Sequence, residues 1–314
     1  MSIVANAWVV DNAAWACARP RLSVLVPFLG DDPRRLLEML DDEAGRMDGA
    51  VEVVVLDDGG GDDELGAGVI QCVEGLAMPA RAVRLVKNEG RAKGRNRLAG
   101  HARGTFMLFL DSDMLPDAPD FLARWLRLAE DEEPAVAFGG FSVKQAPPRR
   151  EHALHRKLAL RSDCAPAKRR RKRPEKYVFT SNLLVRREVF EAEAFDERFI
   201  GWGWEDVEWG IRVARRHPVV HIDNTATHLG LDTARTIAAK YEESAANFGR
   251  VCRAHADVVR AYPSHKAARL LKPVPLKGLW RPVLKGVALA ERAPLPVRAF
   301  ALRLYRAALY AEAV

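Results

Sequence analysis

Cysteine is scarce in this chain, and long apolar runs are absent. Four cysteines occur among 314 residues, far apart and without a C-x-x-C pair. This argues against a zinc ribbon or a disulfide framework and favours a reducing compartment, the cytoplasm. No stretch reaches about 18 uncharged apolar residues, so we expect no transmembrane helix. The first residues carry no basic segment and Asp11 interrupts their apolar run, so we also expect no signal peptide.

The positive charge is confined to two segments. The formal net charge is +7, yet residues 144–176 carry 13 Lys and Arg against 3 Asp and Glu, and residues 260–314 carry 11 against 2. Removing these local excesses of 10 and 9 leaves −12 for the rest of the chain. An acidic body excludes a surface that tracks nucleic acid along its whole length. Two basic appendages instead fit contact with an anionic surface such as a membrane.

Apolar runs alternate with helical patterns along most of the chain. Runs rich in Val, Leu and Phe predict buried strands, and apolar residues three and four apart predict helices. This alternation implies an α/β, Rossmann-like fold with a mostly parallel central sheet flanked by helices. The expected strands are 22–27, 51–56, 82–86, 105–110, 135–141, 177–185 and 219–222. The expected helices are 33–47, 91–102, 117–132, 206–216 and 232–256.

Changes of composition divide the chain. We expect an N-terminal extension over residues 1–20, a main α/β domain over 21–260, and a basic helical tail over 261–314 that prolines break into pieces. The basic segment 144–176 contains the run KRRRKR and is expected to form a mobile loop within the main domain.

Acidic pairs stand just after two expected strands, where ligands of parallel sheets collect. Asp57 and Asp58 precede three glycines. A carboxylate there can accept a hydrogen bond from a base or a ribose hydroxyl, although a solvated glycine turn also fits. Asp111 and Asp113 follow the run TFMLFL and can share Mn²⁺ or Mg²⁺ with substrate phosphates. An acidic turn is the alternative, but an unpaired acidic pair beside a buried strand is costly.

A basic segment lies between these pairs. Residues 88–96 read NEGRAKGRN, which places Lys93 and Arg95 in the first turns of an expected helix that follows Asn88. Cationic side chains beside the N–H groups of a helix start suit a diphosphate. A solvated basic helix face is the alternative.

The segment FIGWGWEDVEWGI, residues 199–211, is the most informative. Its glycines and tryptophans surround Glu205 and Asp206 just before a helix. Aromatic walls withdraw a carboxylate from water, which raises its pKa and suits it to general-base work. We assign the base to Asp206 and the orientation of an acceptor to Glu205. Trp202 or Trp204 offers an indole face to a sugar. The alternative is that the two carboxylates only favour the helix N-terminus.

Three further polar residues are candidates for the site. His228 follows a short expected strand and is the best third metal ligand beside the acidic pair, with His221 as the alternative. Asn182 lies in the TSNLLV segment, where it either lines an acceptor pocket or is a buried structural residue.

Taken in order, these motifs resemble the family 2 glycosyltransferases of the GT-A fold. The likeness covers roughly residues 20–230 and lies in the strand ending VP, VVVLDDGG, KNEG with GRNRLAG, FLDSD, TSNLLVRREVF and GWGWED. The last is similar to a segment of chondroitin-polymerase-type and galactosyltransferase-type enzymes. The glycines at 59–61 replace the usual Gly-Ser. The resemblance implies a donor site at Pro27, Asp57, Asp58, Asn88, Lys93, Arg95 and Asp111, a DxD metal site at Asp111 and Asp113, and Glu205 or Asp206 at the acceptor.

The resemblance also implies an activity. It predicts inverting, metal-dependent transfer of a hexosyl or N-acetylhexosaminyl group from a nucleotide-diphosphate sugar, with a UDP-sugar expected. The acceptor is a hydroxyl of a glycan or lipid-linked molecule, in polysaccharide or glycoconjugate biosynthesis. The QxxRW motif of processive synthases is absent, which favours transfer of single sugars.

Two other classes remain open. A catalytically inactive glycan-binding scaffold is one, although the intact Asp111, Asp113 and Asp206 argue against it. A sugar-phosphate nucleotidyltransferase is the other, but it should carry a glycine-rich GxGxRxxP loop where this chain reads VPFLGDDP.

The tail carries a membrane pattern. Arg298, Arg303 and Arg306 share one arc of an expected last helix, with apolar residues on the rest, which predicts an interfacial helix on the inner face of the cytoplasmic membrane. Trp280 among basic residues is a second anchor. A tail that packs on the domain or mediates a dimer is the alternative. The KRRRKR run lacks aromatic residues for base stacking, so we expect no nucleic-acid partner.

Overall fold

The computed structural model describes residues 2–4 and 6–314. Its strands are β1 Ser2–Val4, β2 Ala7–Asp11, β3 Leu22–Phe28, β4 Val51–Asp57, β5 Ala80–Leu85, β6 Phe106–Phe109, β7 Met114–Pro116, β8 Val136–Phe138, β9 Phe141–Ser142, β10 Leu183–Arg186, β11 Val219–His221 and β12 Ala226–His228. Nine of them form one sheet in the order β1-β2-β5-β4-β3-β6-β10-β8-β11. The other three form a small sheet in the order β7-β12-β9.

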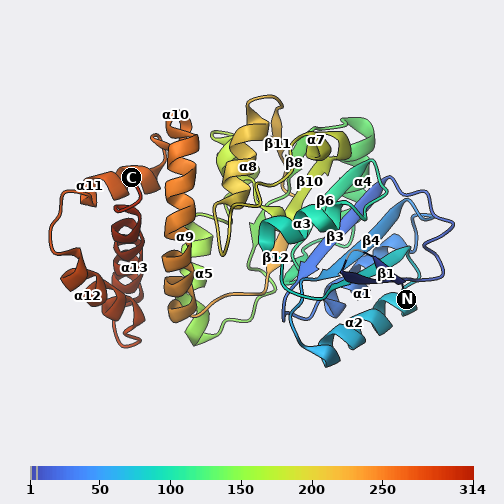
Figure 1. The fold of residues 1–314 in the computed structure, drawn as a ribbon, viewed down its shortest axis with the longest axis horizontal. Helices are drawn as coiled ribbons and strands as arrows, with labels where there is room; N and C mark the ends of the chain where they lie inside the picture. The colour runs from blue at the N-terminus through green and yellow to red at the C-terminus, as the bar shows by residue number, and fades with distance from the viewer. Residues whose placement is uncertain (1, 5) are drawn as a thin grey trace.

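Helices cover both faces of the large sheet (Figure 1). They are α1 Arg34–Ala44, α2 Asp63–Gly75, α3 Arg91–Ala99, α4 Phe121–Asp131, α5 Ala153–Arg161, α6 Ala167–Arg170, α7 Arg187–Ala192, α8 Glu205–Ala214, α9 Ala234–Ala254, α10 Ala256–Val259, α11 Pro263–Leu271, α12 Lys277–Leu289 and α13 Leu295–Tyr310. Short 3-10 turns are η1 Arg150–His152, η2 Pro174–Tyr177 and η3 Thr180–Asn182.

The central strands are parallel, which confirms the expected α/β fold. β5, β4, β3 and β6 pair in parallel, whereas β2 and β10 add antiparallel neighbours. Every residue of β4 is buried, because apolar side chains of α1, α2 and α4 cover one face and those of α3, α7 and α8 the other. The carboxyl ends of β3, β4 and β6 therefore open onto one edge, where a parallel sheet places its site.

Several segments differ from the sequence-based expectation. The expected strand 177–185 is a strand only from Leu183, because Thr180–Asn182 form the turn η3. Residues 7–11, assigned to an N-terminal extension, form β2 and extend the large sheet. The basic segment 144–176 is not a loop, because it folds into η1, α5, α6 and η2. Leu154 of α5 is fully buried in a cluster with residues of α9 and α13, and the buried guanidinium of Arg170 bonds the Gly139 carbonyl at 3.2 Å. Tertiary contacts therefore order a segment whose charge predicted mobility.

The tail packs on the domain, which was the alternative to a lipid-facing last helix. In Figure 1 α13 runs alongside α9, with α11 and α12 on its outer side. Arg298, predicted to meet lipid headgroups, is buried, and its Nε donates to the Ala288 carbonyl at 3.0 Å. Within residues 2–4 and 6–314 no helix is long and apolar enough to cross a bilayer.

We expect the α13 interface to contribute strongly to stability. Leu302 is fully buried in the cluster that joins α5, α9, α12 and α13. Leu302→Ala should lower the free energy of unfolding in urea by about 2–5 kcal/mol, since it leaves a cavity. Leu279→Ala, at a side chain that is 70% exposed, is the matched control and should change it by about 0.5 kcal/mol or less. Equal effects of the two substitutions would contradict the packing described for α13.

Candidate active site

Most of the expected site residues lie at the edge formed by the carboxyl ends of the parallel strands. Asp57 ends β4 and Asp58 follows it, while Asp111 and Asp113 lie between β6 and β7. Asn88 lies between β5 and α3. Pro27, in β3, pairs with Leu56 and so lies beside the first acidic pair.

Asp58 fastens the loop that leads into α3. Its two carboxylate oxygens accept hydrogen bonds from the backbone N–H of Glu89 at 2.8 Å and of Gly90 at 3.0 Å, and Asn88 Nδ2 donates at 3.3 Å. Burial raises the pKa of Asp58, while these backbone bonds oppose the rise. Gly59 has φ +69°, and a Cβ there would lie 2.4 Å from the Lys87 carbonyl carbon. The first glycine of the 59–61 run is therefore required for the loop to close.

Asp57 is held differently. Arg84 Nε donates to its Oδ2 at 3.1 Å and Gly60 N to its Oδ1 at 3.1 Å. Arg84 also contacts Asp63 of α2 at 2.6 Å. Asp57 is therefore fixed in orientation at the strand end, and Arg84 is a neighbouring cation that the sequence reading missed.

Helix α3 carries two arginines one turn apart on the same face. Arg95 Nη2 donates to Asp111 Oδ1 at 2.6 Å, and Arg91 Nε donates to Glu205 Oε1 at 2.8 Å. Arg95 is only 3% exposed, so it fixes Asp111, whereas Arg91 is partly exposed and reaches within 4.0 Å of the same carboxylate. Lys93 pairs with Glu89 at 3.5 Å and belongs to the other side of the helix.

The glycine–tryptophan segment before α8 is a loop with left-handed backbone at Gly201, Gly203 and Trp204. Asn247 of α9 clamps it by donating to the carbonyls of Ile200 and Gly203, both at 3.0 Å. Trp204, at φ +77°, costs conformational energy that these contacts must offset. The contacts that offset this strain therefore fix the start of α8 and the carboxylates on it.

The two candidate tryptophans both contact the C-terminal helices. Trp204 Nε1 donates to the Tyr310 hydroxyl at 3.0 Å, and its ring packs on Phe248 with ring centroids 4.8 Å apart. Trp202 packs against Tyr241 at 6.4 Å. Trp204 thus anchors α13, and Trp202 packs on α9, where Lys240 Nζ also lies 5.9 Å from its ring.

Glu205 and Asp206 have distinct surroundings. Glu205 is 3% exposed and paired with Arg91. Asp206 accepts from Thr180 Oγ1 at 3.2 Å and from Thr180 N at 3.4 Å. Burial, and then the charge of Glu205, raise the pKa of Asp206 to about 7. A carboxyl group that exchanges its proton near neutral pH is suited to general-base work.

Asp113 and His228 form a contact pair. The His228 Nε2 and Asp113 Oδ2 atoms are 3.1 Å apart. Burial opposes both charges, but the mutual contact prevails, so the pKa of Asp113 is lowered and that of His228 is raised. A Cβ at residue 230 would lie 2.0 Å from Asp113 Oδ2. Gly230 therefore leaves just enough room for the pair.

The three predicted metal ligands are only partly assembled. Asp111 is turned to Arg95 while Asp113 and His228 touch. Among residues 2–4 and 6–314 no group of three His, Cys, Asp or Glu side chains is arranged to hold a metal ion. Asp31, after β3, is a further carboxylate in range, since burial and then the charge of Asp113 raise its pKa. The sequence analysis did not select it, although Asp31 and Asp32 form an acidic pair shortly after β3.

Two other candidates are structural. His221 is fully buried between Arg170 Nε at 3.3 Å and the Pro174 carbonyl at 3.2 Å, and burial lowers its pKa to about 4. Asn182 is also fully buried, and its Nδ2 donates to the carbonyls of Gly140 at 3.0 Å and Asn224 at 2.8 Å. Neither side chain reaches the solvent. This argues against His221, the alternative to His228 as a metal ligand. Asn182 does not line a pocket and has the structural role that was its alternative.

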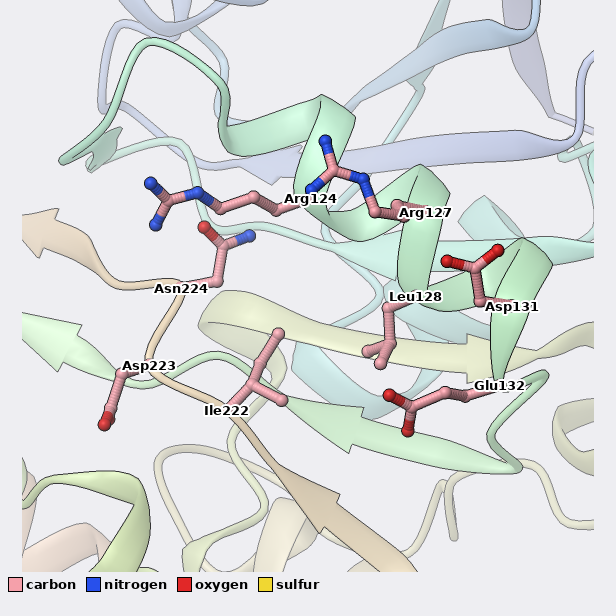
Figure 2. Close-up of a pocket in the computed structure, with 8 residues that line it drawn as sticks. All are labelled: Arg124, Arg127, Leu128, Asp131, Glu132, Ile222, Asp223 and Asn224. Atoms are coloured by element: carbon pink, nitrogen blue, oxygen red, sulfur yellow. The ribbon is translucent and has the colours of Figure 1, made fainter.

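A hollow of about 280 Å³ opens elsewhere, between α4 and the segment that joins β11 to β12 (Figure 2). Charged side chains such as Arg124, Arg127 and Asp131 surround it, and none of the candidate site residues lines it. It is separate from the strand-end site.

Comparison with known proteins places this chain. A glycosyltransferase of Bacillus subtilis (strain 168), YfnE, itself uncharacterized, is 32% identical over 123 residues, which are 38% of this chain and 30% of that protein. The matched part is therefore under a third of the relative's length.

Two solved structures share the fold. The mannosyltransferase PcManGT from Pyrobaculum calidifontis, in complex with GDP-Man and Mn²⁺, aligns over 95% of this chain and 88% of its own at 18% identity, with a TM-score of 0.58. GalNAc-T7, with UDP, GalNAc and Mn²⁺, aligns over 72% and 47% at 14% identity, with a TM-score of 0.52.

The sequence profile described as "Glycosyl transferase family 2" matches residues 23–193, more than half of the 314 residues. The likeness to the solved glycosyltransferase structures confirms the GT-A fold. The chain belongs to glycosyltransferase family 2.

Proposed function

We propose that the protein transfers a single sugar from a nucleotide-diphosphate sugar to a hydroxyl group of a glycan or lipid-linked acceptor, with inversion at the anomeric carbon. The observation that carries this is the two acidic pairs at the carboxyl ends of the parallel strands β4 and β6, in a chain of family 2. Thr180 orients the carboxyl group of Asp206 at the start of α8, and burial and the charge of Glu205 raise its pKa, which suits it to remove a hydroxyl proton.

The donor belongs at the ends of β3, β4 and β6. Asp57, with Arg84 beside it, faces the nucleoside, and Asp58 shapes the 88–90 loop against it. Arg91, partly exposed at the start of α3, is the cation for the diphosphate. PcManGT was solved with GDP-Man and GalNAc-T7 with UDP, so we take a UDP-sugar as the first donor to test and a GDP-sugar as the second.

The residues fit a divalent cation, Mn²⁺ or Mg²⁺. Asp113 and His228 supply an oxygen and a nitrogen ligand at one point, and Gly230 keeps that point free of a side chain. Ser112 separates Asp111 from Asp113, and Asp111 would share the ion with the phosphates of the donor. When bound, the ion neutralises charge on the departing diphosphate.

The chain's own groups then carry the transfer. Thr180 orients the Asp206 carboxylate through two hydrogen bonds. Asp206 takes the proton of the acceptor hydroxyl group as the hydroxyl oxygen forms the new bond to the anomeric carbon. The bond from that carbon to the diphosphate oxygen breaks at the same time. Glu205, fixed by Arg91, keeps its charge next to the base and so keeps the proton affinity of Asp206 high.

We further propose that the protein works at the cytosolic face of an anionic membrane, through the exposed apolar side chains of α12 and its flanks rather than through the arginines of α13. Leu276, Leu279 and Val283 are 68%, 70% and 63% exposed, and Phe300 lies exposed on the adjacent helix. Residues 263–300 carry eight Lys and Arg against one Glu. Exposed apolar side chains among basic ones suit insertion below anionic headgroups, which also fits a lipid-linked acceptor.

The base assignment predicts a pH profile. Because Asp206 must be unprotonated to accept a proton, kcat/KM should rise with pH up to about 7 and level off above it. Asp206→Asn should leave donor binding intact and lower kcat at least about 100-fold. Glu205→Gln should move the rising limb to lower pH, since it removes a charge that raises the Asp206 pKa. A larger loss in Glu205→Gln than in Asp206→Asn would reverse the two roles.

The metal assignment predicts that adding one methyl group at residue 230 weakens metal-dependent nucleotide binding. Gly230→Ala should displace Asp113 and weaken Mn²⁺-dependent binding of UDP by at least about tenfold. Asp113→Ala should have the same effect. Isothermal titration of UDP with and without Mn²⁺ measures this. Gly286→Ala, where a Cβ meets nothing within 4 Å, is the control. Unchanged metal dependence in Gly230→Ala would place the ion elsewhere.

The membrane proposal predicts flotation with vesicles that contain phosphatidylglycerol, reduced by salt. Leu279→Ser with Val283→Ser should weaken this binding at least about tenfold, while Val86→Ser, at a side chain 59% exposed, should not. Point variants are needed because removal of the tail would expose the buried face of α9 to solvent. The membrane role is refuted if the full-length protein does not bind these vesicles at low salt. It is also refuted if the double variant binds them as the wild type does and loses only self-association.

A further inference from the structure

A chain of polar contacts leads from the proposed metal ligands to α9. The rings of His228 and His155 meet edge to face, with their centroids 5.8 Å apart. His155, in α5, accepts a hydrogen bond at Nδ1 from the backbone N–H of Asp232 at 2.7 Å. Lys240 of α9 donates to Asp232 Oδ2 at 2.7 Å, and its Nζ lies 5.9 Å from the centroid of the Trp202 ring. We call His155, Asp232 and Lys240 the α5–α9 cluster.

The loop that carries Asp232 is fixed to the proposed metal ligands by its backbone. The N–H of Leu229 donates to the Asp113 carbonyl at 2.8 Å, and the N–H of Leu231 donates to the Leu229 carbonyl at 2.8 Å. Helix α5 lies against α9 (Figure 1), so His155 and Lys240 approach Asp232 from two helices. The cluster therefore has a set position beside Asp113 and His228.

The contact with Asp232 determines which nitrogen of His155 carries the proton. A backbone N–H can only donate, so Nδ1 of this ring is unprotonated and the proton is on Nε2. In the described part of the chain no hydrogen bond reaches His155 Nε2 or Asp232 Oδ1. Neither atom is among the buried polar atoms that lack a partner, so both are open to solvent. The cluster thus offers one free donor and one free acceptor.

This pair of free groups matches the hydroxyl groups of a sugar. A hydroxyl group both donates and accepts, so Asp232 can accept from one hydroxyl while His155 donates to its neighbour. The two side chains are only 17% and 16% exposed, and hydrogen bonds that are shielded from water are stronger than those at an open surface. A phosphate or carboxylate ligand would instead be repelled by the charge of Asp232.

The position of the cluster indicates which sugar it meets. In a one-step displacement the anomeric carbon lies between the departing diphosphate oxygen and the acceptor hydroxyl. The transferred sugar therefore adjoins the metal on one side and the base on the other. His155 contacts His228, a proposed metal ligand, and Lys240 contacts Trp202 in the clamped loop that leads to Asp206. The cluster connects the two sides between which that sugar must lie.

We propose that His155 and Asp232 bind hydroxyl groups of the transferred sugar and so select the donor, while Lys240 fixes the Asp232 carboxylate. This rests on the proposed function and adds the residues that recognise its sugar. The class of ligand is an uncharged sugar unit with adjacent free hydroxyl groups. The residue His155 comes from the segment 144–176, whose charge alone had pointed to a membrane surface.

The test compares bare nucleotide diphosphates with nucleotide sugars in the full-length protein. UDP, GDP, UDP-glucose, UDP-galactose, UDP-N-acetylglucosamine and GDP-mannose are titrated calorimetrically in the presence of Mn²⁺. Asp232→Asn should weaken binding of the best-bound nucleotide sugar at least about tenfold, because it removes a charged acceptor. Binding of the corresponding bare diphosphate should not change.

Two substitutions of His155 separate a ligand contact from a structural one. His155→Asn keeps an acceptor near the Nδ1 position for the Asp232 N–H but removes the Nε2–H donor. It should weaken binding of the nucleotide sugar about three- to tenfold. His155→Gln keeps an N–H donor near the Nε2 position and should weaken it by less. His265→Asn, the same change on α11, is the control and should bind as the wild type.

Weaker sugar binding in His155→Asn and Asp232→Asn, with diphosphate binding and thermal unfolding unchanged, supports the proposal. Sugar binding equal to that of the wild type overturns it, and so does an equal loss of diphosphate binding, since the cluster would then only hold the metal ligands or the loop. A larger loss in His155→Gln than in His155→Asn, or a wild type that binds UDP or GDP but none of these sugars, also overturns it. Absence of Mn²⁺-dependent binding of both UDP and GDP overturns the proposed function instead.

Discussion

The pair of arginines at the start of α3 is the interaction on which the site depends. Arg95 holds Asp111 at the end of β6, and Arg91 holds Glu205 across 114 residues of sequence. Glu205 is almost completely buried, and loss of its partner would leave an uncompensated charge, which costs about 3–5 kcal/mol. Helix α3 therefore fixes the strand-end carboxylates and the first turn of α8 in one frame, and the proton affinity of Asp206 follows from that frame.

The sequence was sufficient for the central parallel strands and for the acidic residues that follow them, but not for β1, β2 or the small sheet. Runs rich in apolar residues mark β3, β4 and β6, and the rule that ligands gather at carboxyl ends predicts the strand-end positions of Asp57 and Asp111. The ion-pair partners of the charged residues could not be predicted from the sequence in this way. Nothing local distinguishes Arg91, which pairs with Glu205, from Lys93, which pairs with Glu89 four residues before it. Only the crossing of α3 with α8 separates them.

The tail shows a second limit. An amphipathic pattern records that one face is buried but not whether lipid or protein covers it. For α13 the cover is α9 and α5, so Arg298 turns to a helix carbonyl and Arg306 turns toward Tyr241. The charge of residues 144–176 misled for the same reason, since Arg170 finds carbonyl acceptors inside the fold. Helix α2, absent from the expected elements, had a usable signal in Asp62, which caps it through Leu65 N at 2.9 Å.

The family assignment and the specificity of the enzyme come from different parts of the chain. The family profile ends at residue 193 and so contains the donor side, with Asp57, Asp111 and the α3 arginines. Asp206, the proposed base, lies beyond it. Because the strained loop before α8 is clamped by α9 and by Tyr310 of α13, the C-terminal helices set the position of the base as well as the surface around it. A change of acceptor within this fold can therefore be made by altering these helices, while the donor frame stays as it is.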